Sequence, residues 1–186
     1  MIRDVKLTNP EAGGEIIVYG ASAATVLDSE LGSAWVDELS PVTFIGNVIA
    51  DGITVNEFNP ESVGGESVIR DNVLGNITLG GPVIVEGNEF PAELANEDGP
   101  IGVYVLRGGG WVVRDNVIRG HSYGMQALPD GVIEGNIIEG NDIGFYYTGD
   151  PPAMSGNRIC DSKIANVRGM QTDAELDATA NEICPE

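Results

Sequence analysis

A six-residue pattern that returns along the whole chain constrains its fold more than any other feature. The pattern is an apolar residue, any residue, Asp or Gly, Asn, any residue and a second apolar residue, and it is clearest at 69–74, 113–118 and 133–138. Further copies lie at 44–49, 85–90, 154–159 and 178–183, and degenerate copies at 2–7 and 26–31 carry Val5 and Ser29 in the Asn slot. A repeat of this kind predicts a solenoid of stacked, similar turns.

The spacing of the Asn slot indicates one turn of chain per copy. The eight gaps between the nine slots, from position 5 to position 181, average 22 residues. Both apolar slots hold apolar residues in all nine copies, far above chance for a chain with 42% hydrophobic residues. Short strands closed by Gly, Asn or Asp predict an all-β fold. We expect a right-handed, single-stranded parallel β-helix of about nine coils, in one domain spanning 1–186.

The Asn slot has a physical reason to recur, because amides stacked about 4.8 Å apart can bond to one another in an internal ladder. In its apolar slots and its recurring Asn, the repeat resembles the parallel β-helix repeat of the pectate-lyase-like superfamily. That group includes carbohydrate-binding and sugar-hydrolase proteins and periplasmic maturation proteins. The segments 156–160 and 181–185 are similar to the tails of secreted bacterial β-helix proteins. The resemblance implies the fold but no single activity, because many functions share it.

A second short strand follows the repeat in most copies, usually after Gly. In three successive coils its outward residue is expected to be Tyr104, then Gln126, then Tyr146. Two coil steps would separate the tyrosines by roughly 10 Å, close to two sugar rings of a β-linked chain. Aromatic rings with polar tips suit a glycan, so this column predicts a binding surface. The alternative is that Tyr is simply a good strand residue.

The corner beside this column is expected to carry Arg119, His121 and Glu139 as further binding residues. His121 is the sole histidine. As a catalytic base it would need an orienting carboxylate, which Glu139 or Asp142 one coil on could supply. The alternative is a solvent-facing histidine in a turn. None of the catalytic strings of enzymes with this fold occurs, so no catalytic residue is predicted, and whether the chain is an enzyme stays open.

Calcium is the one cofactor that the sequence keeps as an alternative. Asp28, Asp71 and Asp115 occupy the slot before the anchor. Coils with Gly in that slot separate them, and no loop has the alternating Asp, Asn and Gly spacing of a calcium loop. A solvated acidic face is the other interpretation, and no metal-ligating set is predicted.

The charge balance limits the partners. The chain has 29 acidic and 9 basic residues and a net charge of −20. Such a field repels nucleic acid and anionic membranes, and no run is long enough for membrane insertion. The strand-like start directly after Met1 suggests a fragment of a longer protein, the alternative being a cytosolic chain that begins here. Ile2 and Leu7 would leave an unpaired strand edge, so oligomers by coil-end stacking are also considered.

Two cysteines give the sharpest prediction. Cys160 and Cys184 each lie three residues after an anchor Asn, in a slot that looks like a corner or surface position. Equal register in consecutive coils would place their Cα atoms about 4.8 Å apart, within the range of a disulfide. A bridge would clamp the last coil and imply export to an oxidising compartment, hence an extracellular or cell-surface location. The alternative is a reduced, cytosolic pair.

These features predict a non-catalytic extracellular β-helix module that binds a polysaccharide or a cell-surface partner, or acts as a rigid spacer. The alternative is a carbohydrate-active enzyme (polysaccharide lyase, epimerase or glycoside hydrolase) with part of its site outside this chain. A periplasmic maturation factor is a third interpretation. Only two insertions are sizeable, at 56–67 and 91–100, whereas an enzyme of this fold usually has long loops along a groove.

Overall fold

The computed structural model describes residues 2–3, 14–19, 24–37, 41–56, 67–94, 101–106, 109–170 and 180–185. In these residues the regular structure is almost entirely parallel β-strand, with one 3-10 turn, η1 (Ala92–Leu94). Among the described residues, no helix has the length and apolar character needed to cross a membrane.

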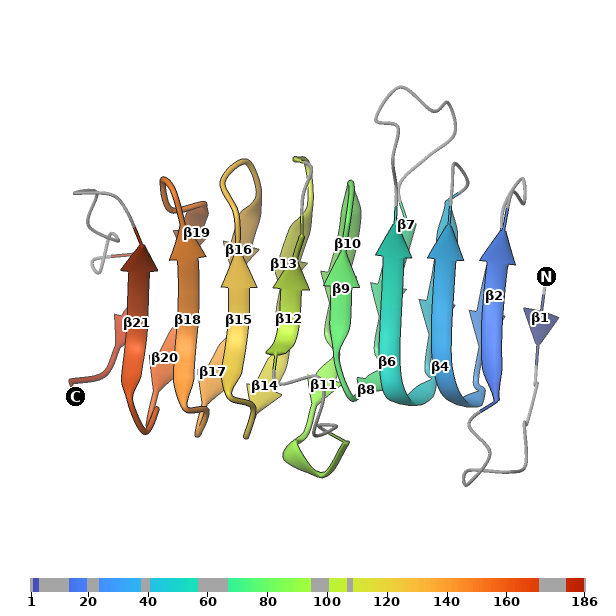
Figure 1. Ribbon diagram of the computed structural model, residues 1–186, viewed down its shortest axis with the longest axis horizontal. Helices are drawn as coiled ribbons and strands as arrows, with labels where there is room; N and C mark the ends of the chain where they lie inside the picture. Colours follow the sequence, from blue (N-terminus) through green and yellow to red (C-terminus); the bar gives the residue numbers. More distant parts are fainter. Residues whose placement is uncertain are drawn as a thin grey trace.

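The strands stack in three rows around one core (Figure 1). The back sheet holds the strands that precede each anchor, namely β1 (Ile2–Arg3), β3 (Ala24–Leu27), β5 (Val42–Ile45), β7 (Ser67–Arg70), β10 (Val83–Glu86), β13 (Val112–Arg114), β16 (Val132–Glu134) and β19 (Ala153–Ser155). The short row holds the strands just after each anchor, namely the starts of β4 (Glu30–Asp37) and β6 (Val48–Asn56), then β8 (Val73–Leu74), β11 (Glu89–Phe90), β14 (Val117–Arg119), β17 (Ile137–Glu139), β20 (Arg158–Cys160) and β22 (Glu182–Ile183).

The front row completes each coil. It consists of β2 (Glu15–Tyr19), the ends of β4 and β6, then β9 (Ile77–Leu79), β12 (Ile101–Val105), β15 (Tyr123–Ala127), β18 (Ile143–Thr148) and β21 (Ala165–Met170). In Figure 1 the front-row strands rise toward the viewer's top, and the chain returns behind them while advancing from the N-terminus to the C-terminus. This winding is right-handed, so the predicted parallel β-helix is confirmed.

The number of turns is about six, so the expected nine coils are too many. Six coils are described without a break, at 24–37, 42–56, 67–79, 112–127, 132–148 and 153–170. The coil at 83–105 contains residues 95–100, which lie outside the described part. Among the described residues, the first and last copies of the repeat contribute only the two-residue strands β1 and β22, so counting each copy as a full turn gave too high a number. Leu7, of the predicted exposed edge, also lies outside the described residues.

The two apolar slots of the repeat fill the core. Ile49, Leu74, Ile118 and Ile138 are all 0% exposed, as expected from their slot. Met154 and Ile183 are only partly buried, near the C-terminal end of the solenoid. Because every turn repeats the same inward columns, one continuous apolar core runs through the stack.

The anchor residues form the predicted internal ladder. In each step the backbone N–H of one Asn donates to Oδ1 of the Asn in the next coil, at 2.9 to 3.1 Å, from Asn47 through Asn72, Asn88, Asn116, Asn136 and Asn157 to Asn181. Each side-chain amide of Asn47 through Asn157 donates to the same oxygen. Ser29 ends the ladder, since its N–H donates to Asn47 Oδ1 at 2.9 Å. The buried polar column is therefore satisfied from coil to coil.

In seven copies, from Asp28 to Gly156, the slot before the anchor is a left-handed backbone position, which explains why it holds Asp or Gly there. Asp28, Asp71 and Asp115 have φ of 49°, 56° and 54°, a region that Gly, Asn and Asp adopt most readily. A Cβ at Gly46 would lie 2.7 Å from Asp28 Oδ1, and one at Gly135 would lie 2.4 Å from Asp115 Oδ1. Each Asp thus occupies space that the Gly of the next coil leaves open, so the alternation has a steric cause.

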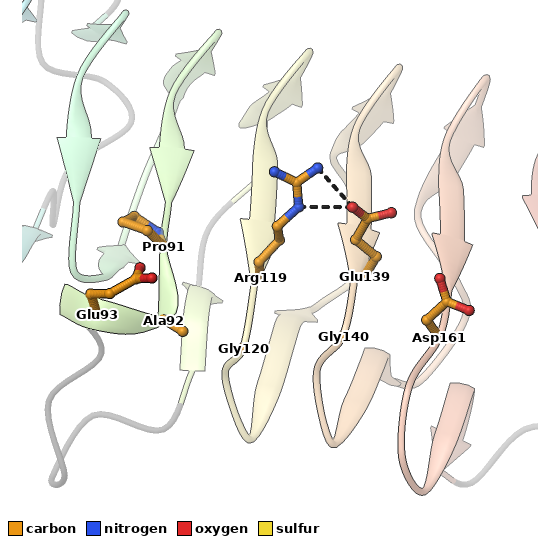
Figure 2. A pocket seen from close by; sticks show the side chains of 8 residues that line it. All are labelled: Pro91, Ala92, Glu93, Arg119, Gly120, Glu139, Gly140 and Asp161. Carbon is orange, nitrogen blue, oxygen red and sulfur yellow. Dashed lines mark hydrogen bonds and ion pairs between the residues drawn. The ribbon is translucent and has the colours of Figure 1, made fainter.

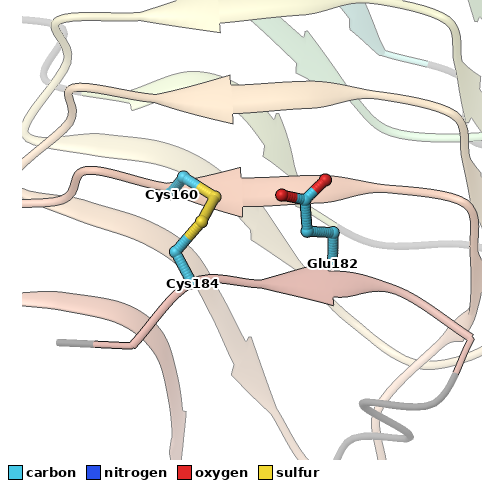
Figure 3. Close-up of side chains that lie close together, drawn as sticks. All are labelled: Cys160, Glu182 and Cys184. Atoms are coloured by element: carbon cyan, nitrogen blue, oxygen red, sulfur yellow. A yellow bond between two sulfur atoms is a disulfide. The ribbon is translucent and has the colours of Figure 1, made fainter.

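Cys160 and Cys184 form a disulfide, as predicted (Figure 3). Their Cα atoms lie 4.9 Å apart and the bridge spans 24 residues. It joins β20 to the chain just after β22, which pairs with β20 in register. Cys160 itself is fully buried, so the expectation that this slot lies at the surface is wrong for Cys160. The bridge therefore links the last two strands of the short row.

Candidate functional site: an aromatic column and a corner pocket

The structure places Tyr104, Gln126 and Tyr146 in one column of the front row. Tyr104 pairs with Gln126 between β12 and β15, and Gln126 pairs with Tyr146 between β15 and β18. All three side chains are partly exposed, while their strand neighbours Val105 and Ala127 point into the core. The column that the sequence predicted is therefore present, with two strand steps of about 4.8 Å between the tyrosines.

The ring of Tyr146 is held by a second tyrosine. Tyr123, at the start of β15, packs its ring against Tyr146 with centroids 5.8 Å apart and planes at 71°. Edge-to-face packing of this kind favours a defined ring orientation. Tyr146 is thus presented as a fixed surface feature.

The same column continues beyond the predicted residues in both directions. Backbone pairing extends it from Tyr104 back through Thr78, Thr54 and Trp35, and from Tyr146 on to Arg168. Trp35 is 41% exposed. The alternation of 31–37 could have revealed Trp35, but the register shift between Leu31 and Ser33 obscures the repeat there. We call the residues from Trp35 to Arg168 the tyrosine column.

Arg119 and Glu139 face each other across neighbouring coils, on the short-row side of the corner. Arg119 Nε donates to Glu139 Oε1 at 2.8 Å, and Arg158 also donates to Glu139. The hydrogen bond and charge of Arg119 hold the pKa of Glu139 below its usual range, and Arg158 adds to this effect. Glu139 is therefore an ionised carboxylate at neutral pH and cannot act as a proton donor there.

These two residues line a pocket of about 560 Å³ at this corner (Figure 2). The 3-10 turn of the insertion forms one side and packs closely on the corner, since a Cβ at Gly120 would lie 2.3 Å from Ala92 Cβ. Glu93 and Asp161 bring two further carboxylates, and the remaining lining residues are Pro91, Ala92, Gly120 and Gly140. Sequence reasoning missed Glu93, because the path of the insertion is not encoded in the repeat. It also missed Asp161, although this residue occupies the slot four after the anchor that Gly120 and Gly140 hold in the two preceding coils.

His121 does not line the corner surface, so both expectations for its surroundings are wrong. It is 2% exposed, and its ring Nε2 lies 3.2 Å from the carbonyl oxygen of Phe90. Its N–H donates to Asn141 Oδ1 at 2.9 Å, and Asn141 Nδ2 donates to the equivalent carbonyl, that of Ile118, at 3.2 Å. His121 thus takes the place of an Asn in a second ladder inside the solenoid. Burial lowers its pKa, against the opposing effect of the Phe90 carbonyl.

The described residues contain one group of three potential metal ligands, Cys160, Glu182 and Cys184. Two of the three are the sulfur atoms of the disulfide (Figure 3), so they offer no thiolate to a metal. Glu182 lies beside Arg158, with Oε1 3.6 Å from Nε. This group is therefore a disulfide with an ion pair beside it, at the C-terminal end of the short row.

The structure divides the six predicted binding residues into three settings. Tyr104, Gln126 and Tyr146 share the tyrosine column, Arg119 and Glu139 share the corner pocket, and His121 is enclosed in the core. Comparison with protein-family models, with curated proteins and with solved structures finds no match.

Proposed function

We propose that this chain is a non-catalytic β-helix module that binds a polysaccharide along the tyrosine column. The observation that carries the proposal is the register of Tyr104, Gln126 and Tyr146, which gives two aromatic rings about 10 Å apart with an amide between them. Alternate rings of an extended β-linked glycan could stack on the tyrosines while the middle ring bonds to the amide. A repeat that resembles the pectate-lyase-like superfamily supports a carbohydrate ligand.

The charges favour a neutral glycan. The chain carries a net charge of −20, which repels polyanionic sugars over the whole surface. The tyrosine column itself, from Trp35 through Thr54, Thr78, Tyr104, Gln126 and Tyr146 to Arg168, contains no acidic residue. A neutral, extended polysaccharide is therefore not repelled electrostatically on this face.

An extracellular or cell-surface location fits this function. The Cys160–Cys184 bridge supports it, because disulfides persist in oxidising compartments and are rare in the cytosol. A stiff solenoid with one binding face would then serve as a spacer as well as a binding module.

A carbohydrate-active enzyme is the second candidate, and the corner pocket favours it. Glu93, Glu139 and Asp161 line the pocket together with Arg119, and paired carboxylates are the groups that glycoside hydrolysis uses. Against this role, Glu139 is engaged by two arginines and stays ionised. Acid catalysis would thus fall to Glu93 or Asp161.

A glycan array with and without calcium, followed by product analysis on each bound glycan, separates these functions. The module predicts binding of neutral β-linked glycans, independent of calcium, with the bound sugar recovered intact. Shortened or unsaturated products would establish the enzyme instead. Absence of binding to every glycan would leave the spacer role and refute the binding module.

A further inference from the structure

Two columns of side chains cover the outer surface of the back sheet between β7 and β16. Backbone pairing holds each column in register from coil to coil. One column is aliphatic and the other is charged; they are Val68, Ile84, Val112 and Val132, and Arg70, Glu86, Arg114 and Glu134. The aliphatic side chains are only partly buried, so folding of one chain leaves an apolar strip on this face.

The charged column is incompletely paired within the chain. Glu86 and Arg114 form an ion pair at 2.9 Å. At one end of the column, Arg70 contacts the adjacent Asp71 at 3.4 Å. At the other end, Glu134 has no ion-pair partner among the described residues, although it lies in register with Arg114. Each end therefore has capacity for an opposite charge.

Read from the opposite end, the column has a Glu wherever it had an Arg, and an Arg wherever it had a Glu. It is therefore complementary in charge to a second copy of itself in the reverse orientation. Consider a two-fold axis parallel to the strands, midway between β10 and β13. It places β7 opposite β16 of a second copy, and β10 opposite β13 of that copy. Arg70 then faces Glu134 of the second copy, and Glu86 faces Arg114 of the second copy. The aliphatic columns face one another at the same time, as a closed two-fold interface requires.

The turn at the edge of this face obeys the same symmetry. The slot before the anchor holds Asp71, Gly87, Asp115 and Gly135 in these four coils. Under the two-fold axis each Asp lies opposite a Gly, so no carboxylate meets a carboxylate. The four charges of the column sum to zero on a chain with a net charge of −20, so the column itself adds no net repulsion between two copies.

We propose that the outer face of the back sheet between β7 and β16 docks a second copy of this chain, with the two solenoids antiparallel. The strip from β7 to β16 spans three strand steps and measures about 14 by 13 Å. This is well below the about 800 Å² per partner of a standard interface, so we expect a weak dimer that exchanges with the monomer. The front row lies on the opposite side of the solenoid (Figure 1), so the dimer leaves both tyrosine columns open.

Sedimentation equilibrium from about 10 μM to about 1 mM tests the proposal. The wild type is expected to show a monomer–dimer equilibrium. Val112→Lys, at the centre of the strip, is expected to raise the dissociation constant at least about tenfold. Its matched control is Val117→Lys, a partly buried outward Val of the same coil but in the short row, which is expected to stay within about twofold of wild type. Circular dichroism checks that both variants are folded.

A charge-inverted variant gives a second, independent readout. Arg70→Glu, Glu86→Arg, Arg114→Glu and Glu134→Arg together keep the alternation within the chain and its self-complementarity. This variant is expected to dimerise with itself but not with the wild type, because mixed pairs bring like charges together. A wild type that is monomeric at every concentration overturns the proposal. So does equal weakening by the two Lys variants, or free mixing of the inverted and wild-type chains.

Discussion

His121 shows how one residue adapts to a place built for another. Inside the second ladder, Nε2 takes the role that the Asn141 amide takes one coil later, since both lie 3.2 Å from equivalent carbonyls. The other ring nitrogen, Nδ1, is buried without a hydrogen-bond partner in the described part of the chain. The ring is therefore held in its neutral form, with its pKa lowered by burial.

Stability should consequently fall as the pH drops below about 6.5, the pKa of a free histidine. Below that value the unfolded chain binds a proton on His121 that the folded chain resists, so acid favours unfolding. His121→Asn should change the free energy of unfolding at pH 7 by less than about 1 kcal/mol, because Asn141 shows that an Asn fits this ladder. Urea titrations at pH 7.0 and 5.5 measure the difference between the two proteins.

The variant should lose less stability than the wild type between these two pH values. The low pKa of Glu139 acts in a different window, since its contribution is lost only as the pH falls below the usual carboxyl range. Equal losses in wild type and variant would show that His121 is not a source of acid sensitivity.

At the scale of the element, each turn constrains its neighbour. Asp and Gly alternate before the anchors because each Asp side chain occupies the space that a Cβ of the next coil's residue would need, and a Gly leaves that space free. Gly87 and Gly156 have nearly the same backbone, with φ of 63° and 65°. A Cβ at Gly87 would lie 2.8 Å from Asp71 Oδ1, whereas at Gly156 the nearest atom, Gly135 N, would lie 3.7 Å away.

Gly87→Asp should therefore destabilise the fold by about 1–3 kcal/mol more than Gly156→Asp. Both variants carry the same cost of a side chain at positive φ, so the difference isolates the contact and the repulsion among three successive carboxylates. Chemical unfolding of the two variants measures it. Equal destabilisation would mean that backbone conformation alone sets the pattern.

The disulfide acts on the last turn. Cys160→Ala with Cys184→Ala should lower the free energy of unfolding by roughly 3 kcal/mol, as expected for releasing a loop of 24 residues. Amide exchange should rise most in β22, which has β20 as its paired strand. Reductant should weaken the wild type and leave the double variant unchanged. Two free thiols on titration of the unfolded, unreduced protein would contradict the bridge.

At the scale of the whole molecule, the repeat predicts the features that recur in every coil, but not the features that occur in one coil alone. The core columns, the Asn ladder and the disulfide all follow from a register that is nearly the same in each coil. His121 was misplaced because a histidine at a corner suggests exposure, and nothing in the local sequence reveals the Phe90 carbonyl one coil earlier. Trp35 was missed because of a register shift, and Glu93 because nothing in the repeat places the 3-10 turn η1 against the corner at Gly120.

The tyrosine column was predictable because strand alternation and coil period together fix which side chains share a face. Its role in binding is the central claim, and the spacing of Tyr104 and Tyr146 makes that claim specific. A disaccharide can reach only one of two rings about 10 Å apart, whereas a tetrasaccharide can reach both. Affinity for a neutral β-linked glycan should therefore rise with length up to the point at which both rings are covered.

Calorimetric titration of di- and tetrasaccharides into wild type, Tyr104→Ala, Tyr146→Ala and the double variant tests this most directly. For the tetrasaccharide, each single variant should have a dissociation constant at least about tenfold higher than that of the wild type, because only one ring remains. The double variant should not bind. Val112→Ala, a half-buried outward residue on the back sheet, serves as the control and should bind as wild type does. Equal affinity of the wild type and the folded double variant for every sugar length would contradict the account.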